Sequence, residues 1–232
     1  MSPARIVAAV LLVILLAAAL SIDVVKTNPN KSDEATYVLM ALSVAYDHDL
    51  AYQRRDLERY VGIYRWGPDG VFLKRGKQLR LATGGGFPFV HLAKRDDPRA
   101  DRLYFGKAFI YSVAAAPFVR LLGLNGILVF HVLLAFLVCV CAYRFLAARS
   151  QPLASLAFAL AFVGATCVPV YLVFLTPELF NFALVFVAFF LWLYKEVLPD
   201  EHEREVEQLR RQKRSEERRV GKECRSRWSP YH

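Results

Sequence analysis

Two adjacent carboxylates, Asp33 and Glu34, are the residues in this sequence best suited to do chemistry. They follow an uncharged apolar segment, Ile6–Ile22, so they lie close to the point where a membrane would end. A carboxylate at the exterior face of a membrane can act as a general base, deprotonating a hydroxyl or amine while a lipid phosphate departs. The neighbouring acid could orient that base or bind a metal ion. A simpler interpretation is also open, because the helix dipole favours acidic residues in the first turn of a helix.

Basic residues further along the chain offer a partner for a phosphate group. Lys107 lies where polar sequence meets an apolar segment, so its ammonium could hold the phosphate of a lipid-linked sugar as a point charge. Arg102 and Arg120 flank the same region and are candidates to assist. The alternative for these long side chains, above all for Arg120, is ordinary snorkelling toward lipid headgroups.

Three further polar positions are weaker candidates. The Asp-His-Asp stretch at 47–49 resembles a metal-binding Asp-x-Asp, but two aspartates at this spacing point apart on a helix, which favours a solvated helix end. Glu178 is costly to place in lipid and is a candidate cavity acid, although a Thr-Pro-Glu helix start explains it equally well. His131, in the middle of an apolar run, is predicted to form a buried hydrogen bond between helices. No metal site is predicted, and a divalent cation is left open as a cofactor.

The composition predicts a membrane protein. Apolar residues make up 56% of the 232-residue chain, and the mean hydropathy is +0.29, which is high for a soluble domain. A hydrocarbon core of ~30 Å requires about 20 apolar residues per helix. The predicted fold class is an all-α membrane protein with four transmembrane helices, at 1–22, 124–143, 153–175 and 179–194. Gly164 and Pro169 are possible kink sites in the third.

Residues 23–123 are predicted to form an exterior loop that carries juxtamembrane helices between the first two spans. Apolar residues at three- and four-residue spacing indicate a helix over 33–46, and Ser32 is its expected N-cap. A second short helix is expected over 53–64.

The second half of this exterior loop contains a weak strand signal and a short apolar run. The segments 71–75 and 78–82 flank Gly76-Lys77, which suggests a β-hairpin. The run 108–119 is too short for a span and suits an interfacial helix.

The distribution of basic residues predicts the orientation. Arg5 precedes the first span, and Arg144 and Arg149 follow the second, which places the N-terminus on the cytoplasmic side. The expected location is the inner membrane of a bacterium, as a multi-pass protein. Cleavage of the first segment after its alanine run is the alternative to a retained span.

Two C-terminal segments stand apart in composition. Residues 195–213 are charged and predict a cytoplasmic linker or helix. Residues 214–232, RSEERRVGKECRSRWSPYH, resemble the forward translation of a sequencing adapter, and they carry three of the nine net positive charges. We therefore exclude them from fold reasoning and expect the natural protein to continue beyond Lys213. A natural basic tail is the alternative.

The order of these features resembles the GT-C superfamily, the polytopic glycosyltransferases that use polyprenyl-phosphate sugars. Protein O-mannosyltransferases and bacterial lipid A aminoarabinose transferases belong to it. The shared pattern is an N-terminal span, then Asp33-Glu34 with an aromatic residue three positions on, then a long exterior loop. The stretch 104–111 and its Ala-Ala-Pro-Phe continuation extend the resemblance, but Ala108 and Ser112 stand where relatives carry prolines. The resemblance covers residues 5–198.

The resemblance implies the N-terminal fragment of an enzyme, expected to be inactive alone. The enzyme would move a sugar from a polyprenyl-phosphate carrier to an unknown exterior acceptor, with inversion at the anomeric carbon. It implies Asp33 as the general base with Glu34 second, and it agrees with Lys107 and Arg102 at the lipid phosphate. Membrane lipid is an expected partner, and nucleic acid is not. The competing hypothesis is a non-enzymatic polytopic membrane protein with a lipid-binding, assembly or transport role.

Overall fold

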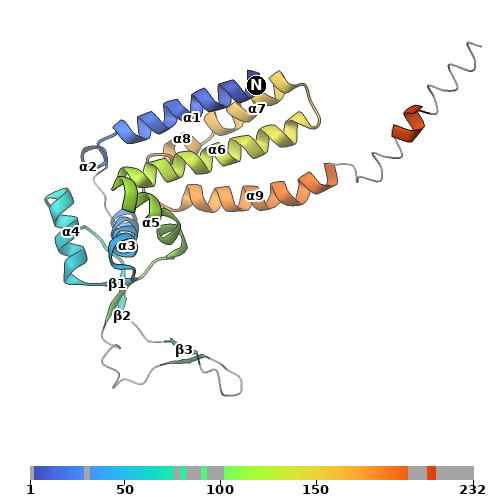
Figure 1. Cartoon of the computed structure of the whole chain (residues 1–232). Coiled ribbons are helices and arrows are strands. Elements are labelled where there is room, and N and C mark those ends of the chain that lie inside the picture. Colours follow the sequence, from blue (N-terminus) through green and yellow to red (C-terminus); the bar gives the residue numbers. More distant parts are fainter. Residues whose placement is uncertain are drawn as a thin grey trace, which may run out of the picture. The chain divides into compact units, whose positions relative to one another are not determined.

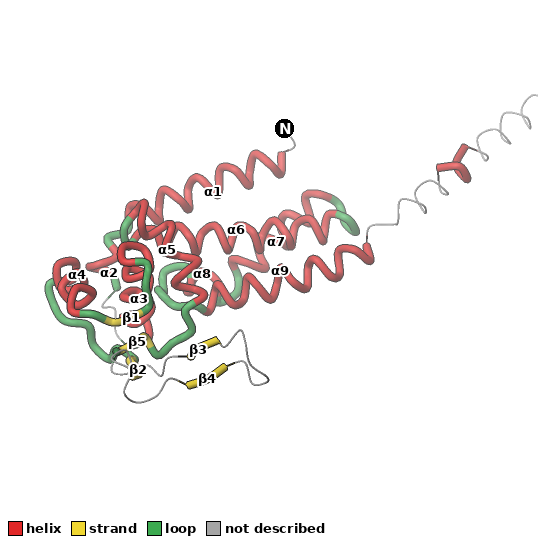
Figure 2. Tube along the Cα trace, turned by 60° about the horizontal axis from the view of Figure 1, so that its bottom comes forward, coloured by secondary structure: helices red, strands yellow, loops and turns green. Residues whose placement is uncertain are grey.

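The computed structural model describes residues 3–28, 32–75, 79–81, 90–92, 102–197 and 208–212. Most of these residues are helical and the strands are short, which confirms the predicted helical class (Figure 2). The chain divides into two compact units, Met1–Val187 and Ala188–His232. The first unit contains nearly all the elements that matter for the site. The second contains the end of the last long helix and a helical stretch at 208–212, within the segment predicted as a linker.

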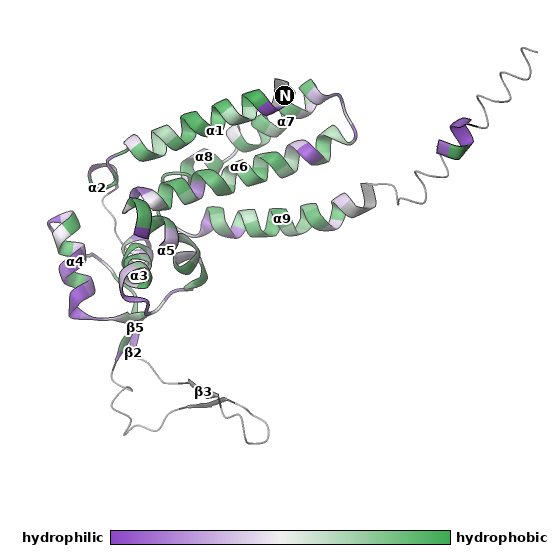
Figure 3. Cartoon of the chain, viewed as in Figure 1, coloured by the Kyte–Doolittle hydropathy of each residue, from purple (hydrophilic) through white to green (hydrophobic). Residues whose placement is uncertain are grey.

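Apolar sequence forms most of the long helices, which are largely green in Figure 3. These helices are α1 (Pro3–Ser21), α5 (Ile110–Leu122), α6 (Asn125–Ala147), α7 (Pro152–Gly164) and α9 (Glu178–Val197). The short helix α8 (Val168–Tyr171) lies between α7 and α9. Among the described residues, only α6 is long and apolar enough to cross a membrane, with 23 residues and a mean hydropathy of 2.5. By length and composition the structure therefore contains one such helix, where the sequence predicted four.

The four predicted spans differ in their outcome. The prediction at 124–143 corresponds to α6, while 1–22 and 179–194 correspond to helices that are apolar but shorter by the same measure. The prediction at 153–175 was wrong as a single helix, because α7 ends at Gly164 and α8 begins at Val168. Pro169 explains the break: proline has no N–H to continue a helix, and it is tolerated in a first turn, which is where it lies in α8.

The start of α6 is tied to the end of α1. The two helices pack against each other (Figure 1), and the Nδ2 atom of Asn125 donates hydrogen bonds to the carbonyl oxygens of Ala19, at 2.8 Å, and Ile22, at 2.7 Å. The last carbonyls of a helix have no partner within it. Asn125 satisfies this end of α1 and joins it to α6.

A close backbone approach connects α5 to α6. A Cβ atom built on Gly126 would lie 2.1 Å from the carbonyl oxygen of Phe118, so only glycine fits there. One turn further along α6, His131 is fully buried, and its Nε2 lies 2.8 Å from the hydroxyl oxygen of Tyr111 in α5. This contact confirms the predicted role of His131 as a buried residue that hydrogen-bonds between helices.

Two helices lie between α1 and α5 in the sequence, after the short helix α2 (Val24–Thr27). They are α3 (Asp33–Asp47) and α4 (Arg54–Tyr64), and they confirm the predicted helices at 33–46 and 53–64. Ser32 is the N-cap residue of α3, as predicted, although its side chain makes no capping hydrogen bond. Its φ of 54° turns the backbone so that its N–H donates to the carbonyl oxygen of Asp69 at 2.7 Å.

The short strands pair differently from the predicted hairpin. β1 (Ala51–Tyr52), β5 (Leu103–Phe105) and β2 (Leu73–Arg75) form one sheet in that order, and β3 (Leu79–Leu81) pairs with β4 (Val90–Leu92). The hairpin over 71–75 and 78–82 was therefore wrong: the first of these segments pairs antiparallel with β5, which is distant in sequence. The turn at Gly76-Lys77 lies outside the described residues.

Candidate functional site

Asp33 and Lys107, which were predicted separately from the sequence as candidate site residues, are in contact in the structure. The Nζ atom of Lys107 lies 2.9 Å from Oδ2 of Asp33 and donates a hydrogen bond to it. The two residues are 74 positions apart in the chain. Their side chains are 27% and 47% exposed, respectively, so the pair remains open to solvent and to an incoming ligand.

Lys107 owes its position to the end of β5. The N–H of Gly106 donates to the carbonyl oxygen of Phe72 at 2.7 Å, next to the register pair Leu73 and Phe105. A Cβ on Gly106 would lie 3.2 Å from that same oxygen, so glycine permits the close approach. The ammonium of Lys107 then lies 4.2 Å from the centre of the Phe72 ring, a favourable cation–π distance.

Asp33 is tied to the same loop. Within the first turn of α3, the hydroxyl oxygen of Thr36 accepts a hydrogen bond from the N–H of Phe72 at 3.0 Å. Just before α3, the N–H of Ser32 bonds Asp69, and Gly70, at φ 71°, packs against Ser32. The loop 69–72 therefore contacts both the helix that carries Asp33 and the strand end that carries Lys107. The hydrogen bonds of this loop therefore hold the backbones that carry Asp33 and Lys107 near each other, in addition to the ion pair between the two side chains.

Glu34 has different partners from Asp33. Its Oε1 atom accepts hydrogen bonds from the side-chain amide of Asn28, at 3.1 Å, and from the backbone N–H of Leu175, at 3.2 Å. The two adjacent carboxylates thus point to different neighbours: Asp33 contacts a cation, and Glu34 connects α3 to the segment before α9.

Two tyrosines near these acids had no role assigned from the sequence. Tyr37 is 6% exposed and contacts the ring of Tyr111 edge-on, with 5.5 Å between the ring centres. Burial raises the pKa of Tyr37 above its ordinary value of 10.0; the charge of Lys107 lowers it, and those of Asp33 and Glu178 raise it. The Tyr37 hydroxyl therefore stays protonated near neutral pH and lies within the electrostatic reach of all three charged groups. The aromatic position three residues after Glu34 was the available signal for it.

The remaining predicted residues lie in different places. Glu178 is exposed in the first turn of α9, as a Thr-Pro-Glu helix start predicts, although the helix begins at Glu178 itself and not at Pro177. Arg102 is exposed, and no contact among the described residues links it to Asp33 or Lys107. The guanidinium of Arg120 lies 5.0 Å from the centre of the Tyr46 ring, at the opposite end of α3 from Asp33.

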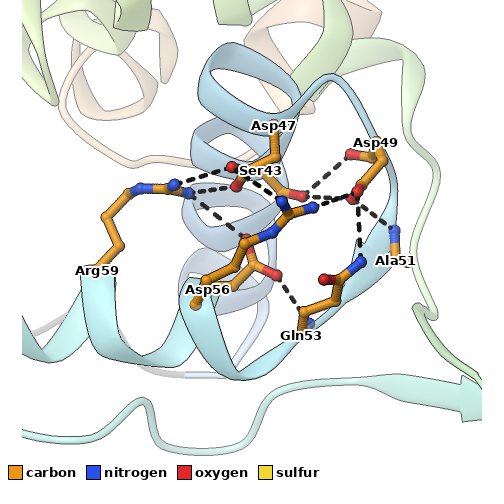
Figure 4. Close-up of polar contacts among 8 residues, drawn as sticks. Ser43, Asp47, Asp49, Ala51, Gln53, Asp56 and Arg59 are labelled. Carbon is orange, nitrogen blue, oxygen red and sulfur yellow. Dashed lines mark hydrogen bonds and ion pairs between the residues drawn. The ribbon is translucent and has the colours of Figure 1, made fainter.

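The aspartates of the Asp-His-Asp stretch belong to an ion-pair cluster, not to a solvated helix end (Figure 4). Asp47 accepts two hydrogen bonds from Arg59 in α4, at 2.6 and 3.1 Å. Asp49 accepts one from Arg55 at 2.6 Å, and others from Ser43 and the backbone of the following strand. The left-handed backbone of His48, at φ 57°, ends α3 and lets both aspartates face α4.

A third aspartate in this cluster is buried. Asp56 is 1% exposed; its Oδ2 accepts the N–H of Gln53 at 2.8 Å, while its Oδ1 has no hydrogen-bond partner in the described part of the chain. Arg59, which already holds Asp47, is 3.6 Å from that oxygen. Burial accordingly raises the pKa of Asp56, whereas hydrogen bonding to Arg59 lowers the pKa of Asp47.

These opposite shifts predict that α4 is held to α3 most strongly near pH 3.8, the ordinary pKa of both carboxyl groups. Asp56, with its raised pKa, contributes stability that is present at low pH and is lost as the pH rises through its folded-state pKa. Asp47, with its lowered pKa, contributes stability that is lost only as the pH falls below its ordinary value of 3.8. Amide exchange of the segment 54–64 should be measured between about pH 3 and pH 8 and corrected for intrinsic rates. It should be slowest near pH 3.8 and become faster toward both ends of this range.

Two substitutions separate the effect of Asp56 at higher pH from the effect of Asp47 at lower pH on the amide exchange of α4. Asp56→Asn keeps an oxygen for the Gln53 N–H and should remove only the loss of protection at higher pH. Asp47→Asn should weaken protection near neutral pH, because it removes the charged partner of Arg59. An unchanged profile in both variants would mean that these carboxylates do not control the attachment of α4.

The donor set does not favour a divalent cation. Asp33 is bonded to an ammonium group, and Glu34 accepts two hydrogen bonds on one oxygen. No group of three or more His, Cys, Asp or Glu side chains lies together in the part of the chain that the structure describes. A hard cation requires several oxygen ligands, so the residues at this site do not fit one.

Comparison with known proteins adds no family assignment: no family model matches this chain, and neither a curated protein nor a solved structure matches it.

Proposed function

We propose that this chain is part of an integral-membrane glycosyltransferase of the GT-C type. It would move a sugar from a polyprenyl-phosphate carrier to an exterior acceptor. The observation that carries the proposal is the contact between Asp33 and Lys107. Sugar transfer from a lipid phosphate needs a base for the acceptor and a cation for the phosphate, and the structure holds one of each at contact distance.

In the proposed reaction, Asp33 accepts the proton of an acceptor hydroxyl or amine. The freed electron pair forms a bond to the anomeric carbon from the face opposite the phosphate. The bond between that carbon and the phosphate oxygen breaks, and polyprenyl phosphate leaves with the bonding electrons. Lys107 stabilises the negative charge that develops on the leaving group. Attack from the opposite face inverts the configuration at the anomeric carbon.

The ion pair also suggests how the base becomes available. The ammonium of Lys107 donates a hydrogen bond to Asp33. A phosphate group competes for the same ammonium, because charge-assisted hydrogen bonds to phosphate oxygens are strong. Donor binding would therefore release the carboxylate when an acceptor is needed.

The setting of the site suits a membrane enzyme. The α3 and α5 helices pack together, and α5 in turn packs on α6, the helix that is long and apolar enough to span. The outer face of α5 is apolar, with Ile110, Val113 and Leu121 exposed, which favours contact with lipid at the interface. The proposal retains four membrane-embedded apolar segments, the third of them broken between α7 and α8, together with an exterior module at 23–123 and a cytoplasmic N-terminus in a bacterial inner membrane.

The proposal is tested most directly on the longer protein. The reading frame in uninterrupted source DNA should continue past Lys213 and encode further apolar helices. Membranes containing that protein should transfer a labelled sugar from a synthetic polyprenyl-phosphate donor. A stop codon soon after Lys213, together with no transfer from any such donor, would favour a non-enzymatic membrane component instead.

Replacing Lys107 with Met should weaken use of the donor. A hydrogen bond to a charged group contributes about 1.5–3 kcal/mol, so the KM for the polyprenyl-phosphate sugar should rise roughly 10- to 100-fold. Lys107→Arg keeps the charge and should recover part of the loss. The matched control is Lys26→Met, because Lys26 is also ion-paired with an aspartate, Asp23, but is exposed and lies outside the site. If both the donor KM and kcat were unaltered in Lys107→Met, the phosphate role would be excluded.

A further inference from the structure

One oxygen atom of Glu34 connects three parts of the chain. Oε1 accepts the side-chain amide of Asn28, which follows α2, and the backbone N–H of Leu175, which lies between α8 and α9. Glu34 itself is in the first turn of α3. Leu175 is 141 positions away in the sequence and fully buried, so its N–H depends on this bond instead of on water.

The bond to Leu175 has a geometric consequence for the other acids. Asp33 precedes Glu34 directly, and Glu178 begins α9 three residues after Leu175. The bond therefore joins the first turn of α3, next to Asp33, to the segment that leads into Glu178 and α9. Both acids act on the same group, since each raises the pKa of Tyr37.

The same contact limits how Glu34 could act as an alternative base. The two donors occupy Oε1, so only the other carboxylate oxygen, Oε2, could accept a proton. Moving the Glu34 carboxylate away would leave the buried N–H of Leu175 without its acceptor, which costs free energy. Glu34 therefore has a structural reason to keep its carboxylate in place.

We propose that Glu34 is a positioning residue: by bonding Asn28 and the N–H of Leu175 with one oxygen, it clamps the start of α3, which carries Asp33, to the segment before α9. The role in catalysis rests on the proposed transferase function. The clamp itself does not, so the two can fail separately.

The clamp is tested on the chain itself, in detergent micelles, by amide hydrogen exchange of the segment 172–178. Glu34→Gln keeps an acceptor oxygen at the same reach, and exchange should stay within about twofold of the wild type. Glu34→Asp keeps the charge but shortens the side chain by one methylene, and Glu34→Ala removes the acceptor. Both should accelerate exchange at Leu175 by about tenfold or more. If the Leu175 amide exchanged at the wild-type rate in all three variants, the proposed clamp would be wrong.

Transfer by the longer protein then separates a positioning residue from a base. As a positioning residue, Glu34 should tolerate Gln, with kcat reduced no more than about threefold, while Asp and Ala lower kcat more strongly and leave the donor KM close to that of the wild type. A general base would show the opposite order, since Gln cannot accept a proton and Asp can. Loss of kcat in Glu34→Gln with Leu175 still protected would overturn the proposal. Absence of transfer in the wild type would reject the transferase function and leave the exchange result standing.

Discussion

Replacing Asp33 with Asn is expected to lower the rate of sugar transfer by about 10²- to 10⁴-fold, the usual contribution of a positioned general base. Asparagine has nearly the same shape as aspartate and retains an oxygen for Lys107, but it cannot take a proton from the acceptor. The loss should therefore appear in kcat rather than in the KM for the donor. The measurement is single-turnover transfer from a labelled polyprenyl-phosphate sugar, by membranes that contain the longer protein.

Folding should survive this substitution. The ion pair between Asp33 and Lys107 is partly exposed, and such pairs contribute about 0–1 kcal/mol to stability. Asp49→Asn is a matched control, because Asp49 is also a partly exposed aspartate bonded to a basic side chain, but it lies at the other end of α3. Transfer close to the wild-type rate in Asp33→Asn would remove Asp33 as the base, whereas equal losses in both variants would point to a general effect on folding.

The largest expected effect on stability comes from Gly126→Ala. The added Cβ would lie 2.1 Å from the carbonyl oxygen of Phe118 and 2.7 Å from the backbone nitrogen of Val119. These are backbone atoms in α5, so relief requires α5 and α6 to separate. Overpacking of this kind costs about 3 kcal/mol, which corresponds to an unfolding midpoint about 6–12 °C lower.

Thermal unfolding in a mild detergent would measure this loss. Gly62→Ala is the control, because Gly62 lies in α4 with no atom within 4 Å of the added methyl group. Alanine at a helix interior is favoured over glycine by up to about 1 kcal/mol, so this variant should be neutral or slightly more stable. An unchanged midpoint in Gly126→Ala would show that α5 and α6 do not approach each other this closely.

Local sequence patterns predicted the helices well and their limits less well. Apolar spacing located α3 to within a residue, although this helix is buried on nearly all sides and not on one face alone, and the predicted helix at 53–64 matches α4 equally closely. The span at 153–175 failed because hydropathy alone does not register a backbone break, although Gly164 and Pro169 were visible there. The hairpin failed for a different reason: β2 pairs with β5 some 30 residues away, and a local turn signal carries no information on such pairing.

The candidate site was predictable residue by residue but not as an arrangement. Asp33 and Lys107 were each identified from their charge and their position beside apolar sequence. Their contact could not be foreseen, because both residues are attached through the backbone N–H and C=O groups of Phe72. The exposed, apolar side chain of Phe72 gives no sign of these backbone bonds in the sequence. The partners of Glu34 were hidden for a similar reason, since one of them is the backbone of a leucine.

The attachment of Asp33 and Lys107 to one loop has a mechanical consequence. Thr36 and Gly106 both bond the backbone of Phe72, so displacing this loop carries Asp33 and Lys107 along together. Glu178, in contrast, begins α9, an apolar helix whose tilt, in the proposed membrane setting, would respond to bilayer thickness. In that setting, thinner or thicker membranes would leave the spacing within the ion pair nearly constant, and any strain would act on the bond between Glu34 and Leu175.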